Sequence, residues 1–259
     1  MARLSKLSRS IAGRTAVVTG SGSGMGRATA HLFADEGAKV AVVDRVAAGV
    51  EAVVAEITEA GGVARGYVVD VSEPAAIVAF ATQVRAELGP VDILINNAGM
   101  SWPVTLMSED WEDSWALTFE VNLTAQARLI RAFHDDLVRN GDGRIVNIAS
   151  TEGLGASKGT SPYTASKTGV IGLTRSLALE YGNKGVTVNC ICPGPIHTGM
   201  TSPIPQDAKE KFARRRVPLR RYGNPEEVAQ ITLSLVLPAS SYLTGTIIPV
   251  DGGMMAQNT

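Results

Sequence analysis

The stretch Thr19-Gly20-Ser21-Gly22-Ser23-Gly24-Met25-Gly26 decides the fold of this chain. It follows a short apolar run, Thr15–Thr19, and leads into a helical pattern, Met25–Asp35. Glycines permit a tight turn and let backbone amides approach a pyrophosphate, and a helix N-terminus offers free N–H groups and a partial positive charge. Many loops are rich in glycine, but this one lies between a strand and a helix. Its position predicts the first β-α-β unit of a dinucleotide-binding fold.

Short β-branched runs alternate with longer helical patterns along the whole chain. The predicted strands are Thr15–Thr19, Lys39–Asp44, Ala64–Val69, Asp92–Asn96, Arg144–Ala149, Val186–Ile191 and Thr246–Val250. The predicted helices are Met25–Asp35, Gly49–Glu59, Ala75–Glu87, Trp111–Arg139, Tyr163–Tyr181 and Pro225–Leu237. Nearly continuous apolar strands are expected in a parallel sheet that is buried on both faces. The alternation predicts an α/β fold of the Rossmann type, a doubly wound parallel sheet of about seven strands with helices on both faces.

The length of 259 residues and the 45% hydrophobic content fit one large α/β domain spanning residues 1–259. We see no internal repeat, low-complexity segment or linker. Residues 1–12 are expected to form an N-terminal extension. Residues 193–223, rich in proline and arginine, are expected to be an irregular substrate-binding loop or lid, although a solvated surface loop explains the charges equally well.

The composition argues against several kinds of partner. The chain has 24 basic and 25 acidic residues, so no general attraction to nucleic acid or membrane surfaces is expected. Cys190 and Cys192 are the only cysteines and are poorly placed to bridge if they share one strand face. Met1–Gly13 lacks the apolar run of a signal peptide, and no long apolar stretch suggests a membrane span. We therefore expect a reduced, cytoplasmic protein without a metal site.

Asp44 ends the second predicted strand, close to the separation of roughly 20 residues from the first glycine that is expected for a ribose-binding carboxylate. A carboxylate there accepts hydrogen bonds from the hydroxyls of NAD and repels the 2′-phosphate of NADP. The neighbouring Arg45 could instead meet that phosphate. These residues favour NAD over NADP. The alternative interpretation is that Asp44 is simply a turn residue at the end of a strand.

Ser150, Tyr163 and Lys167 form a second candidate group. Ser150 follows the predicted strand Arg144–Ala149, and Tyr163 and Lys167 lie four residues apart on one face of a predicted helix. A nearby ammonium favours the phenolate and lowers the pKa of a tyrosine, which acid/base chemistry near neutral pH requires. Each residue also has an ordinary structural explanation, and the Tyr–Lys pair occurs in many helices by chance.

Several short motifs occur in a fixed order along the chain. They are the glycine turn 19–26, Asp70-Val71, Asn96-Asn97-Ala98-Gly99, Asn122, Ser150, Tyr163-Thr164-Ala165-Ser166-Lys167, Pro193-Gly194 and Asp251-Gly252-Gly253. With this set, the chain from Gly13 to Met254 resembles the short-chain dehydrogenase/reductase family in its single-domain form. The resemblance implies an enzyme that interconverts a secondary alcohol and a ketone with a nicotinamide cofactor.

The resemblance also implies a role for each matching residue. Tyr163 would be the acid/base, Lys167 would hold the nicotinamide ribose, Ser150 would orient the substrate oxygen, and Asn122 would hold a relay water. Asp70 would contact the adenine, and Pro193, Gly194 and Thr198 would fix the nicotinamide. The full expected cofactor set is Gly20, Ser23, Gly24, Met25, Gly26, Asp44, Arg45, Asp70, Val71, Asn97, Ala98, Gly99, Tyr163, Lys167, Pro193, Gly194, Ile196 and Thr198.

The substrate is less well defined. The segments that would wall its pocket offer Ser101, Trp102, Glu152, Leu154 and Met200. Trp102 and Leu154 suggest an apolar or cyclic substrate. Glu152 would lie unfavourably beside an anion; it could bind a hydroxyl or an amine, but we expect it to point into solvent. The 3-hydroxybutyrate dehydrogenases place glutamine and histidine where Ser101 and Glu152 stand, so that substrate is disfavoured.

Three functions remain in view. An NAD-dependent alcohol dehydrogenase is favoured by Asp44 and the complete set of catalytic residues. An NADPH-dependent ketoreductase of the 3-oxoacyl-carrier-protein reductase type would require Arg45 to override Asp44. A non-catalytic NAD-binding protein is the third. The wide apolar surface of the helix Pro225–Leu237 and the resemblance predict a homotetramer, with a dimer as the alternative.

Overall fold

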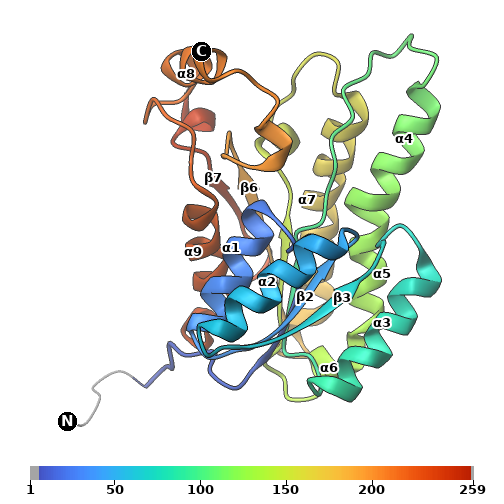
Figure 1. Ribbon diagram of the computed structural model, residues 1–259, viewed down its shortest axis with the longest axis vertical. Helices are drawn as coiled ribbons and strands as arrows, with labels where there is room; N and C mark the ends of the chain where they lie inside the picture. Colours follow the sequence, from blue (N-terminus) through green and yellow to red (C-terminus); the bar gives the residue numbers. More distant parts are fainter. Residues whose placement is uncertain (1–5, 258–259) are drawn as a thin grey trace.

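The computed structural model describes residues 6–257. Its centre is a seven-stranded sheet in the order β3-β2-β1-β4-β5-β6-β7, in which every neighbouring pair is parallel (Figure 1). The strands are β1 Thr15–Thr19, β2 Lys39–Asp44, β3 Val63–Val68, β4 Ile93–Asn96, β5 Arg144–Ile148, β6 Thr187–Pro193 and β7 Ile247–Val250. The predicted Rossmann-type sheet is confirmed.

Helices cover both faces of this sheet. They are α1 Gly24–Asp35, α2 Ala47–Glu59, α3 Pro74–Glu87, α4 Trp111–Phe119, α5 Ala125–Ala132, α6 His134–Val138, α7 Ser161–Gly182, α8 Gln206–Arg216 and α9 Pro225–Val236. Ala16 and Val18 of β1 pack into the core beneath α1, α2 and α9, whereas Val17 packs into the core beneath α3 and α5. Successive strand residues point to opposite faces, so one apolar strand serves two cores.

The strand order places a reversal of direction next to β1. The chain moves from β1 outward to β2 and β3, then crosses back through α3 to β4 on the other side of β1. Ligands of open α/β sheets bind at such a switch point, outside the carboxyl ends of the strands. The fold therefore brings the segments after β1, β4, β5 and β6 to one edge of the sheet.

Two predicted segments differ in the structure. The helix expected over Trp111–Arg139 is divided into α4, a π-helical segment Glu120–Thr124, α5 and α6. The segment 193–223, expected to be irregular, contains α8. Only Ala213 of α8 is buried, so this helix lacks the apolar periodicity from which a helix is predicted.

The expected N-terminal extension is only partly described, because residues 1–5 lie outside the described residues. Ile11 is fully buried in the core beneath α1, and the Gly13 N–H donates a hydrogen bond to the Gly37 carbonyl at 2.8 Å. The end of the extension is thus part of the folded core. At the other end of the chain, α9 begins at Pro225 as predicted, and the Glu227 carboxylate accepts a hydrogen bond from the Asn224 N–H at 2.8 Å.

Cys190 and Cys192 are free thiols buried in β6. Over residues 6–257, none of the helices has the length and apolar character that crossing a membrane requires. Within the same range, histidine, cysteine, aspartate and glutamate side chains form no group of three or more that could hold a metal ion.

The core on the α3 side contains an aromatic cluster that provides a stability test. Phe80 is 1% exposed and makes edge-on contacts with Tyr67 and Phe133, at centroid distances of 5.2 and 5.7 Å. We expect Phe80→Ala to lower the free energy of unfolding by about 3–5 kcal/mol, since it leaves a cavity. Val78→Ala, on an exposed side chain of the same helix, is the control and should change it by less than about 0.5 kcal/mol. Equal effects of both substitutions in urea unfolding would contradict this packing.

Candidate active site

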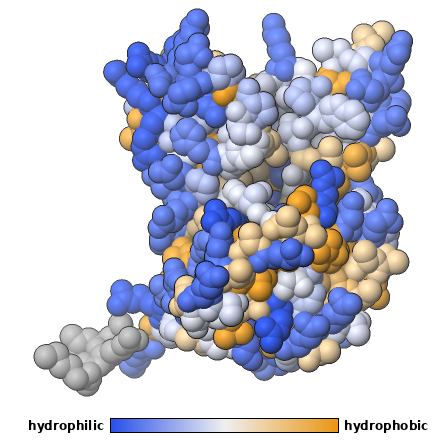
Figure 2. Space-filling model, viewed as in Figure 1, coloured by the Kyte–Doolittle hydropathy of each residue, from blue (hydrophilic) through white to orange (hydrophobic). Residues whose placement is uncertain are grey.

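A cleft of about 380 Å³ opens at the carboxyl edge of the sheet. Figure 2 shows the surface hollowed there, between the part of the molecule that carries α8 and the far end of α4. The predicted site residues that line this cleft are Gly20, Ser23, Gly24, Met25, Asp44, Arg45, Asp70, Val71, Asn97, Ala98, Gly99, Ser150, Tyr163, Lys167, Pro193, Gly194, Ile196, Thr198 and Met200. Residues far apart in sequence therefore meet in one cavity.

Other predicted residues lie outside the lining of the cleft. They are Gly26, Ser101, Trp102, Asn122, Glu152 and Leu154. The structure adds lining residues that the sequence reasoning missed, namely Val43, Val46, Val69, Met100, Val121, Ile148, Ala149, Gly199 and Thr201. Most of these are apolar residues that immediately precede or follow a predicted site residue. Their position next to predicted residues could therefore have indicated them from the sequence.

The glycine turn is shaped by a close approach between α1 and the ends of β1 and β4. A Cβ atom on Gly26 would lie 2.2 Å from the Gly20 carbonyl oxygen, so only glycine fits there. The Asn97 side-chain amide donates to the Thr19 and Gly20 carbonyls at 2.8 and 3.1 Å. Ser23, at the N-cap of α1, makes no side-chain cap, and the first turn holds no acidic residue. The helix N-terminus at the cleft is therefore suited to an anionic pyrophosphate.

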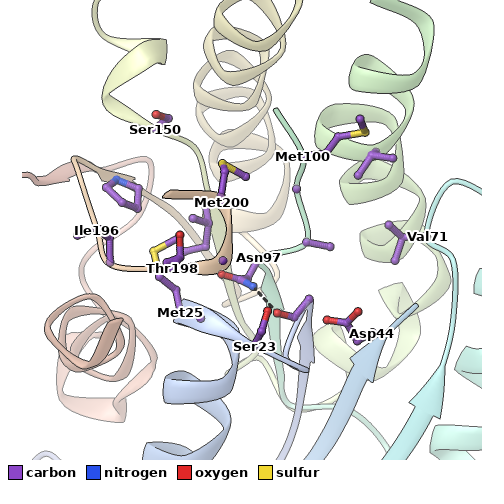
Figure 3. A pocket seen from close by; sticks show the side chains of 18 of the residues that line it. Ser23, Met25, Asp44, Val71, Asn97, Met100, Ser150, Ile196, Thr198 and Met200 are labelled. Carbon is purple, nitrogen blue, oxygen red and sulfur yellow. Dashed lines mark hydrogen bonds between the residues drawn. The ribbon is translucent and has the colours of Figure 1, made fainter. Parts of the chain in front are cut away.

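Asp44 lies at the end of β2, on the floor of the cleft (Figure 3). Its carboxylate accepts hydrogen bonds from the Gly22 N–H at 3.0 Å and the Val46 N–H at 3.1 Å, one on each oxygen. Further lone pairs remain on both oxygens, which suits them to accept hydroxyl donors. Arg45 is exposed beside it. Hydrogen bonds from the Ser72 hydroxyl and N–H, helped by the charge of Arg45, lower the pKa of the nearby Asp70.

Lys167 is a buried lysine with an incomplete set of partners. It is 3% exposed, and its Nζ donates to the Ile148 carbonyl at 2.9 Å. Within residues 6–257 no second acceptor is paired with this ammonium, although it carries three donors. Burial lowers the pKa of Lys167 to about 8. The free donors on this cleft-lining residue are suited to hydroxyl groups of a bound ligand.

Tyr163 differs from the expectation in its ionisation. Burial of the hydroxyl raises the pKa of Tyr163, the neighbouring Ser150 hydroxyl opposes this, and the charge of Glu152 adds to it. The expected lowering of this pKa by Lys167 is therefore wrong for the chain without a ligand. The Lys167 Nζ lies 5.7 Å from the centroid of the Tyr163 ring and faces the ring, while burial acts directly on the hydroxyl.

The orientation of the Ser150 hydroxyl is fixed by the backbone. Its Oγ accepts a hydrogen bond from the Glu152 N–H at 3.1 Å, so its own proton is free to be donated. Ser150 stands directly after β5 and is only 8% exposed. The tyrosine and serine hydroxyls thus meet on one wall of the cleft and could both bind one substrate oxygen.

Asn122 is fully buried in the π-helical segment and acts as a clamp. Its side chain accepts from the Met100 N–H at 2.8 Å, and donates to the Met100 carbonyl at 2.9 Å and to Ser166 Oγ at 3.1 Å. Ser166 Oγ in turn donates to the Tyr163 carbonyl at 2.8 Å, and the Gln126 amide donates to the Asn122 carbonyl at 2.9 Å. Asn122 thereby ties the segment after β4 to α7. Its expected role of holding a water stays a prediction.

The sequence reasoning missed Ser166 and Gln126 as parts of this clamp. Ser166 directly precedes Lys167 in the motif, and Gln126 lies four residues after Asn122 on the predicted helix face. Their spacing from Lys167 and Asn122 could therefore have indicated both residues from the sequence. Their partners depend on tertiary contacts that spacing does not reveal.

Glu152 is a partly exposed residue outside the lining of the cleft, so its expected direction into solvent stays a prediction. Its carboxylate accepts hydrogen bonds from Ser157 Oγ at 2.8 Å and Thr164 Oγ1 at 3.3 Å. Ser101 is partly exposed like Glu152, and the other three expected substrate residues are more open. Trp102, Leu154 and Met200 are 38%, 39% and 50% exposed, and Met200 reaches the cleft.

Taken together, a switch-point cleft, an uncapped helix N-terminus and a half-buried Tyr163 beside the buried Lys167 and Ser150 define the class of dinucleotide-dependent oxidoreductases. A family model described as enoyl-(acyl carrier protein) reductase matches residues 20–255. Subunit BbsD of the (2S)-((R)-hydroxy(phenyl)methyl)succinyl-CoA dehydrogenase of Thauera aromatica is 41% identical over 243 residues, covering 94% of this chain and 97% of that protein. The 3-oxoacyl-(acyl-carrier-protein) reductase FabG of Thermotoga maritima is 37% identical, with 94% and 98% covered.

Solved structures give the same result. A protein of Beutenbergia cavernae described as an NAD(P)-dependent gluconate 5-dehydrogenase, with NADP bound at low occupancy, has a TM-score of 0.90 and 37% identity, covering 96% of this chain and 99% of that one. A 7α-hydroxysteroid dehydrogenase complexed with NADH and 7-oxo glycochenodeoxycholic acid has a TM-score of 0.91 and 32% identity, with 95% and 96% covered. The chain belongs to the short-chain dehydrogenase/reductase family, and it is an oxidoreductase of that family.

The buried ammonium of Lys167 predicts a pH-dependent stability. Its pKa of about 8 in the folded chain lies below that of an exposed lysine, so between these values the unfolded chain binds more protons. The folded state therefore gains stability from this group as the pH rises. Relative to Lys167→Met, the free energy of unfolding of the native chain should increase by up to about 2 kcal/mol from pH 8 to pH 9.5 in urea unfolding. Identical pH dependence of the two proteins would show that Lys167 is not a buried cation.

Proposed function

We propose that this chain is an NAD-dependent oxidoreductase that interconverts a secondary alcohol and a ketone, with Tyr163 as the acid/base. The observation that carries the proposal is the cleft itself, because Asp44 lies in the lining at one side of the switch point while Tyr163 and Lys167 lie at the other. Membership of the family supports the reaction class. Catalysis then requires a hydride donor or acceptor and a proton donor or acceptor at the same carbon–oxygen bond.

The chain offers a complementary surface for the whole dinucleotide. The uncapped N-terminus of α1 would hold the pyrophosphate. Asp44 would bind the adenosine ribose, and Asp70 and Val71 would contact the adenine. Lys167 would hold the nicotinamide ribose, and the segment Pro193–Thr198 the nicotinamide end. When bound, the nicotinamide supplies or accepts the hydride. The free donors of Lys167 and the small residues of the turn are the features that fit such a ligand.

The proton would move at the hydroxyl of Tyr163. In the reducing direction this hydroxyl donates its proton to the carbonyl oxygen, and the raised pKa of Tyr163 keeps it protonated for that step. The Ser150 hydroxyl, held by the Glu152 N–H, donates a hydrogen bond to the same oxygen. In the oxidising direction the tyrosine must accept the proton. Hydroxyl acceptors around the Lys167 ammonium would favour its charged form and thereby the phenolate.

The second candidate is an NADPH-dependent ketoreductase of the 3-oxoacyl-carrier-protein reductase type. The exposure of Arg45 beside Asp44 and the NADP in one solved relative favour it. The third, a non-catalytic NAD-binding protein, has less support because Asn122, Ser150, Tyr163 and Lys167 are all present and connected. We prefer NAD because Asp44 lines the cleft where the adenosine ribose would bind.

Titration with NADH and NADPH, followed by fluorescence, tests the cofactor. We expect NADH to bind at least about tenfold more tightly, because the Asp44 carboxylate repels a 2′-phosphate. Asp44→Ser should remove most of this preference. Asp35→Ser, at an exposed aspartate at the end of α1, is the control with the same change of charge and should keep it. Tighter binding of NADPH by the native chain would make the ketoreductase the better assignment.

Tyr163→Phe tests the acid/base. The variant should bind NADH as the native chain does and lose about 10²–10⁴-fold in kcat/KM for any ketone substrate, because the proton donor is gone. Tyr67→Phe is the matched control, since the Tyr67 hydroxyl bonds Glu87 outside the lining of the cleft, and it should retain activity. Undiminished turnover by Tyr163→Phe would refute the mechanism.

We also propose a cytoplasmic homotetramer with a small-molecule substrate, using neither nucleic acid nor a membrane as partner. The two buried free thiols are consistent with a reducing compartment. The apolar width of α9, from which the tetramer was predicted, is largely used within the chain, because α9 packs on α1 and on the sheet. Better support comes from the half-exposed edge strand β7 and the exposed Tyr242 and Leu243 beside it.

A further inference from the structure

Glu152 is held in place by a set of neutral hydroxyl groups. Ser157 and Thr164 donate to its two carboxylate oxygens, as described above. Thr160 extends the set, since its hydroxyl lies 3.3 Å from that of Thr164 and donates to the Ser157 carbonyl at 2.9 Å. These contacts fix the carboxylate without neutralising it. None of the ion pairs formed within residues 6–257 involves Glu152.

This carboxylate is rigidly connected to the reacting groups. The Glu152 N–H binds Ser150 Oγ, and Thr164 directly follows Tyr163. The turn that carries Glu152 packs closely on α7, because a Cβ atom on Gly153 would lie 2.8 Å from the Lys167 carbonyl oxygen. The negative charge of Glu152 raises the pKa of Tyr163, so its field reaches the hydroxyl where the substrate oxygen would bind. A negatively charged substrate group beside that hydroxyl would experience the same repulsion.

Apolar side chains surround the same end of the cleft. Met100 and Met200 both line the cavity together with Ser150, and Figure 3 shows Met200 between Ser150 on its left and Met100 on its right. Leu154 is exposed close to Glu152, and a Cβ atom on its neighbour Gly155 would lie 3.3 Å from the Met255 side chain. Met255 therefore lies beside Gly155, and Leu154 and Met255 are both partly exposed, at 39% and 37%.

The neighbouring loop after β4 is apolar as well. The Val104 N–H donates to the Gly159 carbonyl at 2.8 Å, which places the loop after β4 beside the loop that follows Glu152. This loop after β4 carries Trp102, Leu106 and Met107, of which Met107 is 90% exposed. Exposed apolar groups that gather around a cavity mark a surface that binds an apolar partner or ligand.

We propose that Glu152 is a specificity-determining residue that restricts the substrate to uncharged, apolar secondary alcohols and ketones and rejects those that carry a carboxylate near the reacting carbon. This inference rests on the proposed function of the same cleft. The apolar side chains around the cleft favour binding of apolar substrates, and the fixed carboxylate of Glu152 disfavours substrates that carry a negative charge. Ser157 and Thr164 hold the charge in position and are positioning residues.

The test compares two ketones that differ in charge, the methyl ester of 3-oxocyclohexanecarboxylic acid and the 3-oxocyclohexanecarboxylate anion, with NADH as the reductant. For the native chain we expect kcat/KM for the ester to exceed that for the anion at least about tenfold. Glu152→Gln keeps the size of the side chain and can still bond both hydroxyls, so it should reduce this ratio about tenfold. Glu152→Asp keeps the charge and should keep a clear preference for the ester.

Glu59→Gln is the control, because Glu59 is an exposed residue at the end of α2 and its substitution changes the net charge equally. It should leave the ratio as in the native chain. A merely structural role of Glu152 would lower activity on both ketones together and leave their ratio unchanged.

Three outcomes would overturn the inference: equal use of the anion by the native chain, an unchanged ratio in Glu152→Gln, or no turnover of the neutral ester by a chain that binds NADH. Failure of the proposed function has a different signature. It would show as an absence of NADH binding, or as turnover that does not depend on Tyr163.

Discussion

The close approach between α1 and the ends of β1 and β4 is the constraint on which the site depends. Gly26 leaves no room for a side chain against the Gly20 carbonyl, and the Asn97 amide joins the same carbonyl to β4. This contact brings the uncapped N-terminus of α1 to the switch point of the sheet. The parallel strands then deliver Asp44, Ser150 and the segment after Pro193 to the same edge. The cleft is a consequence of strand order and one glycine contact.

Burial determines the chemistry of the groups in that cleft. Lys167 lies beneath the surface with free donors, so its pKa falls, and the hydroxyl of Tyr163 is buried, so its pKa rises. Both shifts favour neutral forms in the chain without a ligand. A ligand that offers hydroxyl acceptors to Lys167 would restore the ammonium and make proton transfer at Tyr163 easier. The clamp formed by Asn122 and Ser166 holds the backbone of Tyr163, on the helix that also carries Lys167.

The sequence predicted the sheet well because its strands are continuous apolar runs. β1 and β2 have the predicted bounds, and the other strands differ by one or two residues at one or both ends. The glycine turn, Asp44 and the Tyr163–Lys167 pair were found from spacing. α8 was missed because it buries only Ala213, and the π-helical segment at Asn122 was missed because it leaves the apolar pattern continuous. The hydrogen-bond partners of Glu152 were also missed, since Ser157 and Thr164 reach its carboxylate only in the folded chain.

A crystal structure of the chain with NADH tests the central claim most directly, because it shows whether the dinucleotide occupies the switch-point cleft. The account predicts the pyrophosphate at the N-terminus of α1, the adenosine ribose on the Asp44 carboxylate, and the nicotinamide ribose within hydrogen-bond distance of Lys167 Nζ. The nicotinamide ring should then lie beside Ser150 and Tyr163. A dinucleotide bound elsewhere, or one whose nicotinamide lies away from Tyr163, would contradict the account.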